Sequence, residues 1–463
     1  MQQAARQVGD GSNSPTAGLP VAVVGAGFSG TLLAINLRRL GVDVVLVERE
    51  ASNFAKGLAF GTIWPDHLLN VRASNMSAFP DDPGHFLRWL GFSGEDQAAR
   101  FVPRLRYGHY LSELLFNEVS GTQGRMTLRE GDVRALRCDS DRAVLRLSDG
   151  DEIAARAVVL ALGNLPPAPH PLLAHLPGDG YFADPWDEGA MRDIAHIDHI
   201  LLLGTGLTAV DVVLSLESAG WRGRVTALSR RGLRPRAHAA HGPVVDPVPP
   251  PHLRGSWLVR CVRRRAAEIG WRGAVDELRP HVQDLWRRHD PAAQGRFLRH
   301  LRPYWDVHRH RIAPEVAARL ERLEQEGRLR FLAGRIVKAD PVGRCVRLEW
   351  RPRGADMARV MRTGRIVSCT GPEGDITRVA HPLLRGLVDA GQARPDVHRL
   401  GLDVDHLGRV RDLAGRPQSR VFAAGPVTKG EAWEIIAVPD IRHQLWNMAR
   451  YLSRAHWVGG EGL

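Results

Sequence analysis

Two stretches of the chain repeat one order of apolar and polar positions. In each, a short apolar run is followed by a glycine-rich turn, by apolar residues at helical spacing, and then by a second apolar run. The runs cover 19–24 and 44–47 in the first stretch, and 200–203 and 225–228 in the second. The pattern predicts strand, turn, helix and strand in both places, which is the repeating unit of a parallel α/β sheet.

The first turn has the spacing G-x-G-x-x-G of a dinucleotide site, in the order Gly25-Ala26-Gly27-Phe28-Ser29-Gly30. The first glycine makes the turn, the second lets the backbone approach a pyrophosphate, and the third permits close packing of helix on strand. The phosphates would lie at the helix N-terminus, where free N–H groups favour negative charge. Glu48 ends the second strand, 48 − 25 = 23 residues after Gly25, where a carboxylate binds ribose hydroxyls. A purely structural turn is the alternative, but the complete pattern favours an FAD site.

The second turn differs from the first at two informative places. It reads Gly204-Thr205-Gly206-Leu207-Thr208-Ala209, with an alanine in the third position, which the pattern allows. Its second strand ends in Ser229, Arg230 and Arg231 where the first ends in an acid. A carboxylate would repel a 2′-phosphate, whereas a hydroxyl and guanidinium groups would bind it. We therefore expect NADPH here, with NADH less favoured; the alternative for the arginines is a solvated charge pair in an arginine-rich chain.

The order of these units predicts an α/β fold with two Rossmann-like dinucleotide-binding domains. Residues 1–18 are expected to form a flexible tail, and 19–195 the first part of the FAD-binding domain. Residues 196–372 would form an inserted NADPH-binding domain, which carries a helical insertion at about 252–328. Residues 373–463 would then complete the FAD-binding domain.

Composition narrows the classes of function. The 463 residues carry a formal net charge of +12, but the excess is nearly all arginine spread along the chain, so we expect anionic small ligands and not nucleic acid. The apolar runs are far shorter than the roughly 20 residues that cross a bilayer. With no targeting segment evident, we expect a cytoplasmic protein without a membrane partner. The four cysteines form no C-x-x-C pair and the histidines no ligand set, so no metal site is expected. The oligomeric state stays open.

Five further segments, taken in order, are similar to one known family. They are GLAFGTIWPDHLLNVRASNMSAF from residue 57, FVPRLRYGHYL from 101, SRRGLRPRAH from 229, YWDVHRHRIAPE from 304 and KGEAWEIIAVPDIR from 429. In these segments the chain resembles the bacterial FAD/NAD(P)-binding flavoproteins, which are related to the class B flavin monooxygenases with two dinucleotide-binding domains.

The resemblance implies contacts to FAD. It places four residues beside the flavin ring, namely Asn70, Arg72, Asn75 and Met76. It also implies that Val133 meets the adenine through its backbone, that Gly163 closes the first nucleotide fold, and that Gly425 lies beside the ribityl or pyrophosphate chain. For the asparagines, hydrogen bonds within a loop are the alternative.

The resemblance also implies an FAD-dependent, NADPH-consuming oxidoreductase. It favours a monooxygenase that oxygenates nitrogen or sulfur of a small polar substrate, anionic or derived from an amino acid, through a flavin C4a-hydroperoxide formed with O2. Relatives that oxygenate ketones, and many that hydroxylate nitrogen, carry F-x-G-x-x-x-H-x-x-x-W. Here YFADPWD at 181–187 lacks the histidine, so ketone oxygenation is not expected. Two alternatives stay open: an NAD(P)H-dependent flavin reductase with a quinone or protein acceptor, and a flavin-binding protein with little turnover.

The segment YWDVHRHR, residues 304–311, supplies the last candidates. We expect His308 and Arg309, together with Asn70, Arg72 and Asn75, to form the catalytic site, where a guanidinium would hold a carboxylate or the NADPH phosphates. The alternative is a basic helix face, or an ion pair of Asp306 with an arginine that holds the insertion down.

Overall fold

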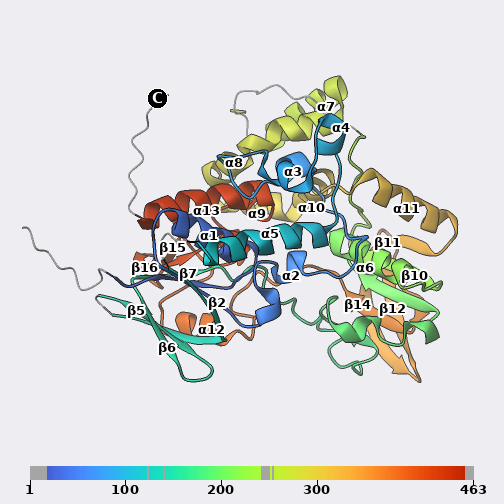
Figure 1. Cartoon of the computed structure of the whole chain (residues 1–463). Coiled ribbons are helices and arrows are strands. Elements are labelled where there is room, and N and C mark those ends of the chain that lie inside the picture. The colour runs from blue at the N-terminus through green and yellow to red at the C-terminus, as the bar shows by residue number, and fades with distance from the viewer. Residues whose placement is uncertain (1–17, 122–124, 140, 241–250, 253–254, 454–463) are drawn as a thin grey trace, which may run out of the picture.

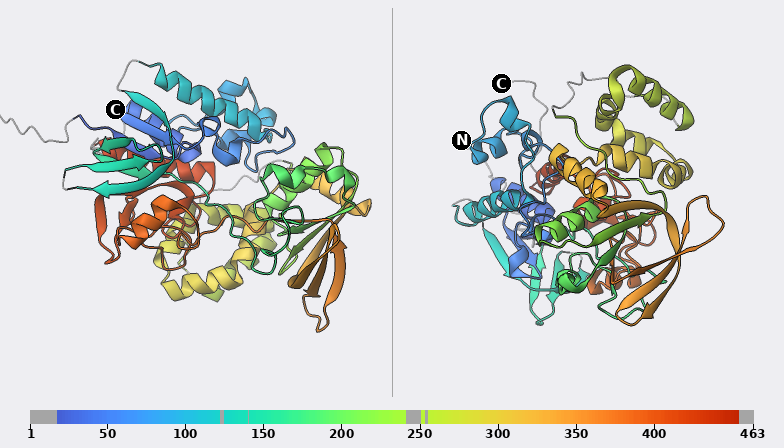
Figure 2. Two further views of the ribbon diagram at one scale, coloured as in Figure 1. Left: turned by 90° about the horizontal axis from the view of Figure 1, so that it is seen from below. Right: turned by 90° about the vertical axis from the view of Figure 1, so that its right-hand side faces the viewer.

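The computed structural model describes residues 18–121, 125–139, 141–240, 251–252 and 255–453. Over these residues the chain forms two lobes, each built on a β-sheet, with a group of helices between and above them (Figures 1 and 2). Residues 1–17 of the expected flexible tail lie outside the described residues. Within the described part, no helix combines the length and apolar character that a bilayer span requires.

The first lobe contains a six-stranded sheet in the order β15-β16-β7-β1-β2-β3. β1 is buried along its whole length, as its uniformly apolar sequence predicts, and it pairs in parallel with β2 and β7. β16 pairs in parallel with β7, so the last part of the chain completes the sheet that the first part begins. The strands are β1 (Val21–Val24), β2 (Val44–Glu48), β3 (Met126–Glu130), β7 (Ala157–Leu160), β15 (Arg409–Arg411) and β16 (Pro417–Ala423).

Two layers cover this sheet, because alternate side chains of β1 point to opposite faces. Val21 and Val23 pack with one helical layer, and Ala22 and Val24 with the other layer. The helical layer consists of α1 (Phe28–Arg39), α5 (Arg104–Val119) and α13 (Val438–Ser453). The opposite layer consists of α12 (Pro382–Asp389) and the antiparallel strands β4 (Val133–Cys138), β5 (Ala143–Leu147) and β6 (Glu152–Ala155). Short helices link β2 to α5, namely α2 (Gly57–Phe60), α3 (His85–Leu90) and α4 (Glu95–Ala98).

The second lobe contains a seven-stranded sheet in the order β13-β12-β11-β10-β9-β14-β8. Its outermost strand β8 precedes residue 196 and pairs in parallel with β14. The strands are β8 (Tyr181–Phe182), β9 (His199–Leu203), β10 (Arg224–Ser229), β11 (Leu329–Val342), β12 (Cys345–Pro352), β13 (Arg359–Thr363) and β14 (Arg365–Ser368). One face is covered by α6 (Leu207–Ser218) and α11 (Pro314–Gln325), whose apolar residues pack with Ile200 and Leu202.

The two sheets repeat one arrangement. The order β7-β1-β2-β3 in the first lobe corresponds to β14-β9-β10-β11 in the second, and a glycine turn and a helix follow the central strand in both. The predicted fold class, an α/β protein with two Rossmann-like domains, is confirmed. The division into domains at particular residue numbers stays a prediction.

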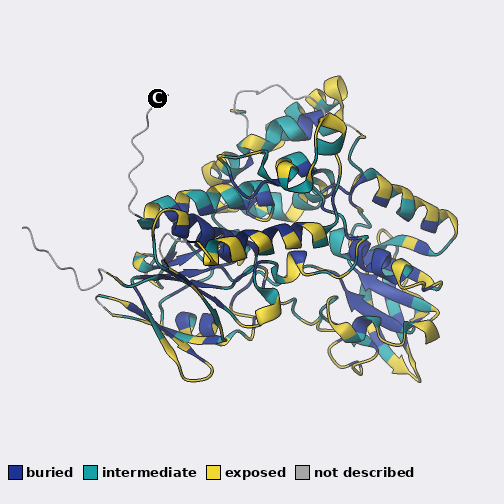
Figure 3. Cartoon of the chain, viewed as in Figure 1, coloured by how far each residue is buried: buried dark blue, intermediate teal, exposed yellow. Residues whose placement is uncertain are grey.

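The helix-rich insertion lies between β10 and α11 and contacts both lobes. The Trp286 indole N–H donates to the Gly430 carbonyl of the first lobe at 2.8 Å, and Arg231 of the second lobe donates to the Arg299 carbonyl at 3.2 Å. The helices are α7 (Gly255–Leu278), α8 (Val282–Arg288), α9 (Pro291–His300) and α10 (Arg302–Arg309). Figure 3 shows buried residues along the second sheet and in α6, whereas α7 carries many partly and fully exposed residues. Residues 253–254 of the expected insertion lie outside the described residues.

Candidate functional site

The first glycine turn has the close packing that its sequence predicts. Gly25 has φ 96°, and a Cβ there would lie 2.5 Å from the Ala161 carbonyl oxygen. A Cβ on Gly30 would lie 2.9 Å from the Gly25 carbonyl carbon and closer still to its oxygen. No side chain fits at either position. Helix α1 begins directly after Gly27, and Phe28 and Ser29 are buried at its N-terminus. The free N–H groups of that turn are suited to phosphate oxygens.

Glu48 lies across this turn. One carboxylate oxygen accepts a hydrogen bond from the Ala26 N–H at 2.7 Å, and the other accepts from the Arg49 N–H at 3.0 Å. The oxygen that accepts from Ala26 retains lone-pair capacity for a ribose hydroxyl, whereas the other also accepts from the Glu50 N–H at 3.5 Å. The Gly131 N–H donates to the Glu48 carbonyl at 2.8 Å, which brings the start of β4 at Val133 alongside. The acid and the predicted adenine contact are therefore neighbours.

Three strand ends meet on the other side of the turn. Val24 pairs with Leu160 in register, and Leu160 pairs with Ala423, so the segments that follow β1, β7 and β16 lie together. Gly163 and Gly425 follow two of these strands with φ 67° and 73°. A Cβ on Gly425 would lie 3.0 Å from the Ser29 Cβ and closer to its hydroxyl oxygen. The predicted FAD residues of 25–30, 163 and 425 thus converge at the carboxyl edge of the sheet, where ligands of such folds bind.

Gly57 is a residue of this region that the glycine spacing did not reveal. It has φ 53°, and a Cβ there would lie 2.9 Å from the Gly27 Cα, so the two backbones are in contact. The available signal was its place at the start of the GLAF segment, but its partner could be identified only from the fold.

The segment expected beside the flavin ring reaches the boundary between the lobes. Arg72 donates to the Ala99 carbonyl and, across the boundary, to the Ala239 carbonyl, both at 2.7 Å. The Asn70 carbonyl accepts from His238 Nε2 at 3.1 Å. Burial lowers the pKa of His238 to about 4, so this imidazole is neutral with its proton on Nε2. Asn75 is exposed, and Met76 is buried in the core of the first lobe.

The second glycine turn is equally tight but more open at its middle position. Gly204 has φ 117°, and a Cβ there would lie 2.7 Å from the Cys369 carbonyl carbon. A Cβ on Gly206 would meet no atom within 4 Å, which leaves room for a phosphate in front of α6. That helix starts with Leu207 and Thr208, directly after the turn.

The three residues at the basic end of β10, Ser229, Arg230 and Arg231, differ in their contacts. The Ser229 hydroxyl accepts from the Gly232 N–H at 3.0 Å and lies 2.9 Å from the Thr205 hydroxyl, so it stabilises the turn itself. Arg231 is directed to the insertion, where it contacts the Tyr304 ring at 5.8 Å as well as the Arg299 carbonyl. Arg230 is exposed, whereas Arg231 is half-buried.

His308 and Arg309 do not face a common pocket. The Arg309 side chain is only 8% exposed, with Nε 3.1 Å from the Glu434 carboxylate and Nη2 3.8 Å from Asp440. His308 donates from Nδ1 to the Tyr304 carbonyl at 2.7 Å and packs edge-on against Trp271. This geometry favours the alternative interpretation, in which ion pairs hold the insertion to the first lobe. Asp306 does pair with an arginine, Arg302 at 3.3 Å, but both residues lie on α10, so this pair does not itself hold the insertion to a lobe.

A groove of about 320 Å³ lies where Arg72 crosses between the lobes. It contains two guanidiniums and two carboxylates around an aromatic ring, and the lining residues are Arg72, Asp96, Ala99, Arg100, Phe101, Ala240, Pro314 and Glu315. Asp96 and Arg100 are close in sequence, but Glu315 belongs to the distant helix α11, so the sequence did not indicate that the three line one groove. No described residues gather three or more His, Cys, Asp or Glu side chains as a metal-ligand set, and all four cysteines are free thiols.

Comparison with known proteins identifies the family of the first segment and the fold of the whole. Residues 22–165 match the family described as FAD-NAD(P)-binding. No curated protein sequence is similar enough to match the chain. The cadaverine monooxygenase of Erwinia amylovora, solved with FAD, has a TM-score of 0.66 at 12% identity, over 93% of this chain and 94% of that chain.

Two further solved structures share this fold. An ornithine N-hydroxylase of Kutzneria sp. 744, solved with reduced FAD, NADP⁺ and L-ornithine, has a TM-score of 0.63 at 16% identity, over 94% of this chain and 99% of that chain. A thioredoxin reductase of T. acidophilum has a TM-score of 0.53 at 13% identity, over 94% of this chain and 98% of that chain. At these identities the likeness establishes a shared fold, and the fold accommodates both FAD and a nicotinamide dinucleotide.

Proposed function

We propose that this chain, which carries an FAD-NAD(P)-binding segment on a two-lobed flavoprotein fold, is an FAD-dependent monooxygenase that consumes NADPH and O2. It would oxygenate the nitrogen or sulfur of a small polar substrate. The observation that carries the proposal is the pair of glycine turns whose second strands end in opposite charges. These are the carboxylate of Glu48 in the first lobe and the guanidinium of Arg230 in the second. The fold shared with an ornithine N-hydroxylase and a cadaverine monooxygenase supports the same reaction class.

The residues of each turn have separable tasks in this proposal. The N-terminus of α1 holds the FAD pyrophosphate and Glu48 its ribose, while the N-terminus of α6 holds the NADPH pyrophosphate. Arg230 is the residue best placed to bind the 2′-phosphate, because Arg231 is already directed to the insertion. Bound FAD supplies acceptance of a hydride from NADPH and transfer of the electrons to O2.

The charged residues that line the groove beside Arg72 are suited to bind a small polar substrate that carries both a positive and a negative charge. Arg72 and Arg100 suit a carboxylate, and Asp96 and Glu315 suit an ammonium group, as an amino acid or its derivative would present. Its position at the crossing of Arg72 into the second lobe would place such a substrate between the two nucleotide sites. We also propose that the protein is cytoplasmic.

A reductase is the second candidate, favoured by the shared fold of the thioredoxin reductase. A dithiol acceptor within the chain is not supported, because the four cysteines are free and scattered. A reductase of this fold would therefore need a quinone or another protein as acceptor. A flavin-binding protein with little turnover is the third candidate, and it differs from both in its rate of NADPH oxidation.

The stoichiometry of turnover tests the proposal. Purified protein loaded with FAD is incubated with NADPH and one of ornithine, lysine, cadaverine or a thioether amino acid, and NADPH loss, O2 uptake, hydrogen peroxide and oxygenated product are measured together. The proposal expects one substrate that raises NADPH oxidation and yields product in proportion to O2. Oxidation that needs an added quinone and proceeds without O2 would instead establish the reductase.

A further inference from the structure

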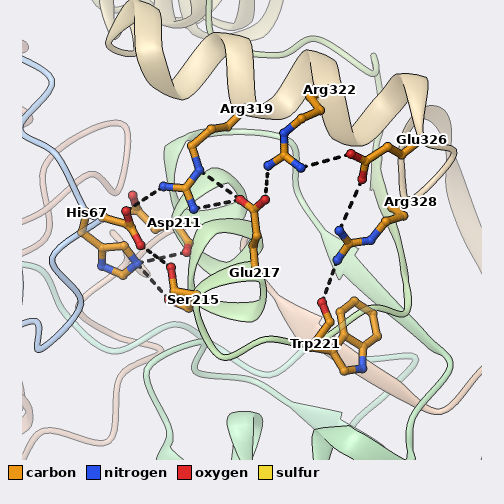
Figure 4. Close-up of polar contacts among 11 residues, drawn as sticks. His67, Asp211, Ser215, Glu217, Trp221, Arg319, Arg322, Glu326 and Arg328 are labelled. Atoms are coloured by element: carbon orange, nitrogen blue, oxygen red, sulfur yellow. Dashed lines mark hydrogen bonds and ion pairs between the residues drawn. The ribbon is translucent and has the colours of Figure 1, made fainter.

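A group of buried polar contacts joins the two lobes at α6. Figure 4 shows His67 of the first lobe against Asp211 and Ser215 of that helix. The His67 side chain is 0% exposed, with Nε2 3.0 Å from the Asp211 carbonyl and 2.8 Å from the Ser215 hydroxyl. The Thr62 hydroxyl lies 2.9 Å from Nδ1.

These contacts define the protonation of His67. The Asp211 carbonyl can only accept, so Nε2 carries the proton and Nδ1 accepts from Thr62. Burial lowers the pKa of His67, which keeps the ring neutral near pH 7. A neutral ring with both nitrogens engaged specifies one orientation of the helix against the first lobe.

Three ion pairs join the elements around this histidine. The Arg104 guanidinium of α5 forms two hydrogen bonds to the Asp211 carboxylate at 2.8 and 3.2 Å, and the two side chains are 19% and 8% exposed. The Arg319 guanidinium of α11 bonds Asp66 of the first lobe at 2.7 Å and Glu217 of α6 at 2.8 Å. Bidentate pairs fix direction as well as distance. The Arg104–Asp211 pair is largely buried, whereas the Arg319 and Asp66 side chains are 28% and 37% exposed. Neither kind of pair adds much net stability, so we expect these pairs to act mainly by specifying the arrangement of the lobes.

The contacts act close to the expected nucleotide site. Asp211 lies four residues after Leu207, which is roughly one turn of an α-helix and about 6 Å along its axis. Because a helix is stiff over this length, a displacement of Asp211 also displaces the N-terminus of α6. We propose that His67, Arg104, Asp66, Asp211 and Arg319 form an interlobe clasp that positions the N-terminus of α6, and so the nicotinamide nucleotide, relative to the flavin.

The proposal rests on the proposed function only for its kinetic readout. If the clasp is loosened, bound NADPH should meet the flavin in the correct geometry less often, while each nucleotide site stays intact. Misplacement by about 1 Å can slow a reaction by about a hundredfold, so a tenfold slower flavin reduction is a conservative expectation. A merely structural role would lower the melting temperature without slowing reduction in the FAD-loaded molecules.

The test compares four variants of the full FAD-loaded chain. Arg104→Met with Asp211→Leu removes both charges of the buried pair, which avoids an unpaired buried ion. His67→Ala removes the central contacts, and His67→Gln retains an amide donor toward Asp211. Arg322→Gln is the matched control, because Arg322 lies on α11 near Arg319 but bonds only Glu217 and Glu326 of the second lobe.

The measurements are anaerobic stopped-flow reduction by saturating NADPH, the Kd for NADP⁺, and small-angle X-ray scattering. The clasp predicts reduction about tenfold slower in the double variant and in His67→Ala, with Kd within about twofold of the wild type. It also predicts recovery in His67→Gln and no change in Arg322→Gln. Wild-type reduction rates in the double variant and in His67→Ala would overturn the proposal. If NADPH fails to reduce the wild type, the proposed function fails, and scattering alone decides: a changed profile in the double variant supports the clasp, and an unchanged profile refutes it.

Discussion

Replacement of Gly30 by alanine tests whether the first turn depends on direct contact between α1 and β1. The added Cβ would lie 2.9 Å from the Gly25 carbonyl carbon and 3.3 Å from Val23 Cγ1. Carbon atoms pack at about 3.5–4.0 Å, so the helix must move away by roughly 1 Å. The obstructing atoms include backbone of the turn itself, which has no rotamer that could yield.

The expected change in the free energy of unfolding combines a gain in helix propensity with a loss from overpacking. Alanine favours the helical state by about 1 kcal/mol relative to glycine. Insertion of a carbon into a packed interior costs about 1–3 kcal/mol, and the rigid backbone neighbour argues for the upper value. We therefore expect a net loss of about 2 kcal/mol in the free energy of unfolding. A helix N-terminus displaced by roughly 1 Å should also lose a charge-assisted hydrogen bond to phosphate, about 1.5–3 kcal/mol, and weaken FAD binding at least tenfold.

The second glycine turn supplies the control, because Ala209 already occupies the position that corresponds to Gly30. Ala209→Gly should cost about 1–2 kcal/mol through helix propensity and lost burial, and it should leave FAD binding unchanged. Urea unfolding and FAD titration followed by flavin fluorescence measure both quantities. Wild-type stability and full FAD affinity in Gly30→Ala would refute the packing argument.

Three further outcomes are expected. Arg230→Ala should raise KM for NADPH by about ten- to a hundredfold and leave KM for NADH unchanged, with a smaller effect for Arg231→Ala, as initial rates of flavin-dependent NAD(P)H oxidation would measure. Glu48→Gln should keep the Ala26 contact through its amide oxygen yet weaken FAD binding by about tenfold, measured by isothermal titration. His238 is neutral in the folded protein with its pKa lowered to about 4, whereas in the unfolded chain it takes up a proton below about pH 6.5. Wild type should therefore lose about 1 kcal/mol per pH unit relative to His238→Gln as pH falls from 6.5 towards 4; an equal difference at pH 7 and pH 5 in urea unfolding would contradict this.

The two nucleotide turns could be predicted because their signals are local. The strand before Gly25 is buried on both faces and reads as an unbroken apolar run, and the glycines occupy positions that steric contact reserves for them. The internal repeat followed because Gly204 begins the same pattern a second time. Such features depend on residues a few positions apart, which a sequence displays directly.

Contacts between distant segments could not be predicted in the same way. His67 and Asp211 are 144 residues apart in sequence, and only the packing of the lobes brings them together. The guanidinium of Arg309 is a group that often binds anionic ligands, but in the structure it points into the interior and pairs with Glu434. The groove near Arg100 likewise depends on the angle between the lobes. These features follow from tertiary packing, which leaves no periodic trace in the sequence.

The most direct test of the central claim measures how fast NADPH and NADH reduce the bound FAD, and how much product forms when O2 is then admitted. FAD-loaded protein is mixed anaerobically with NADPH or with NADH, flavin absorbance is followed, and O2 is then admitted with substrate present. The account predicts one FAD per chain, faster reduction by NADPH than by NADH, and oxygenated product formed in proportion to the O2 consumed. A chain that binds no FAD, or whose bound FAD is reduced equally by both nucleotides and returns only hydrogen peroxide with every substrate tested, would contradict it.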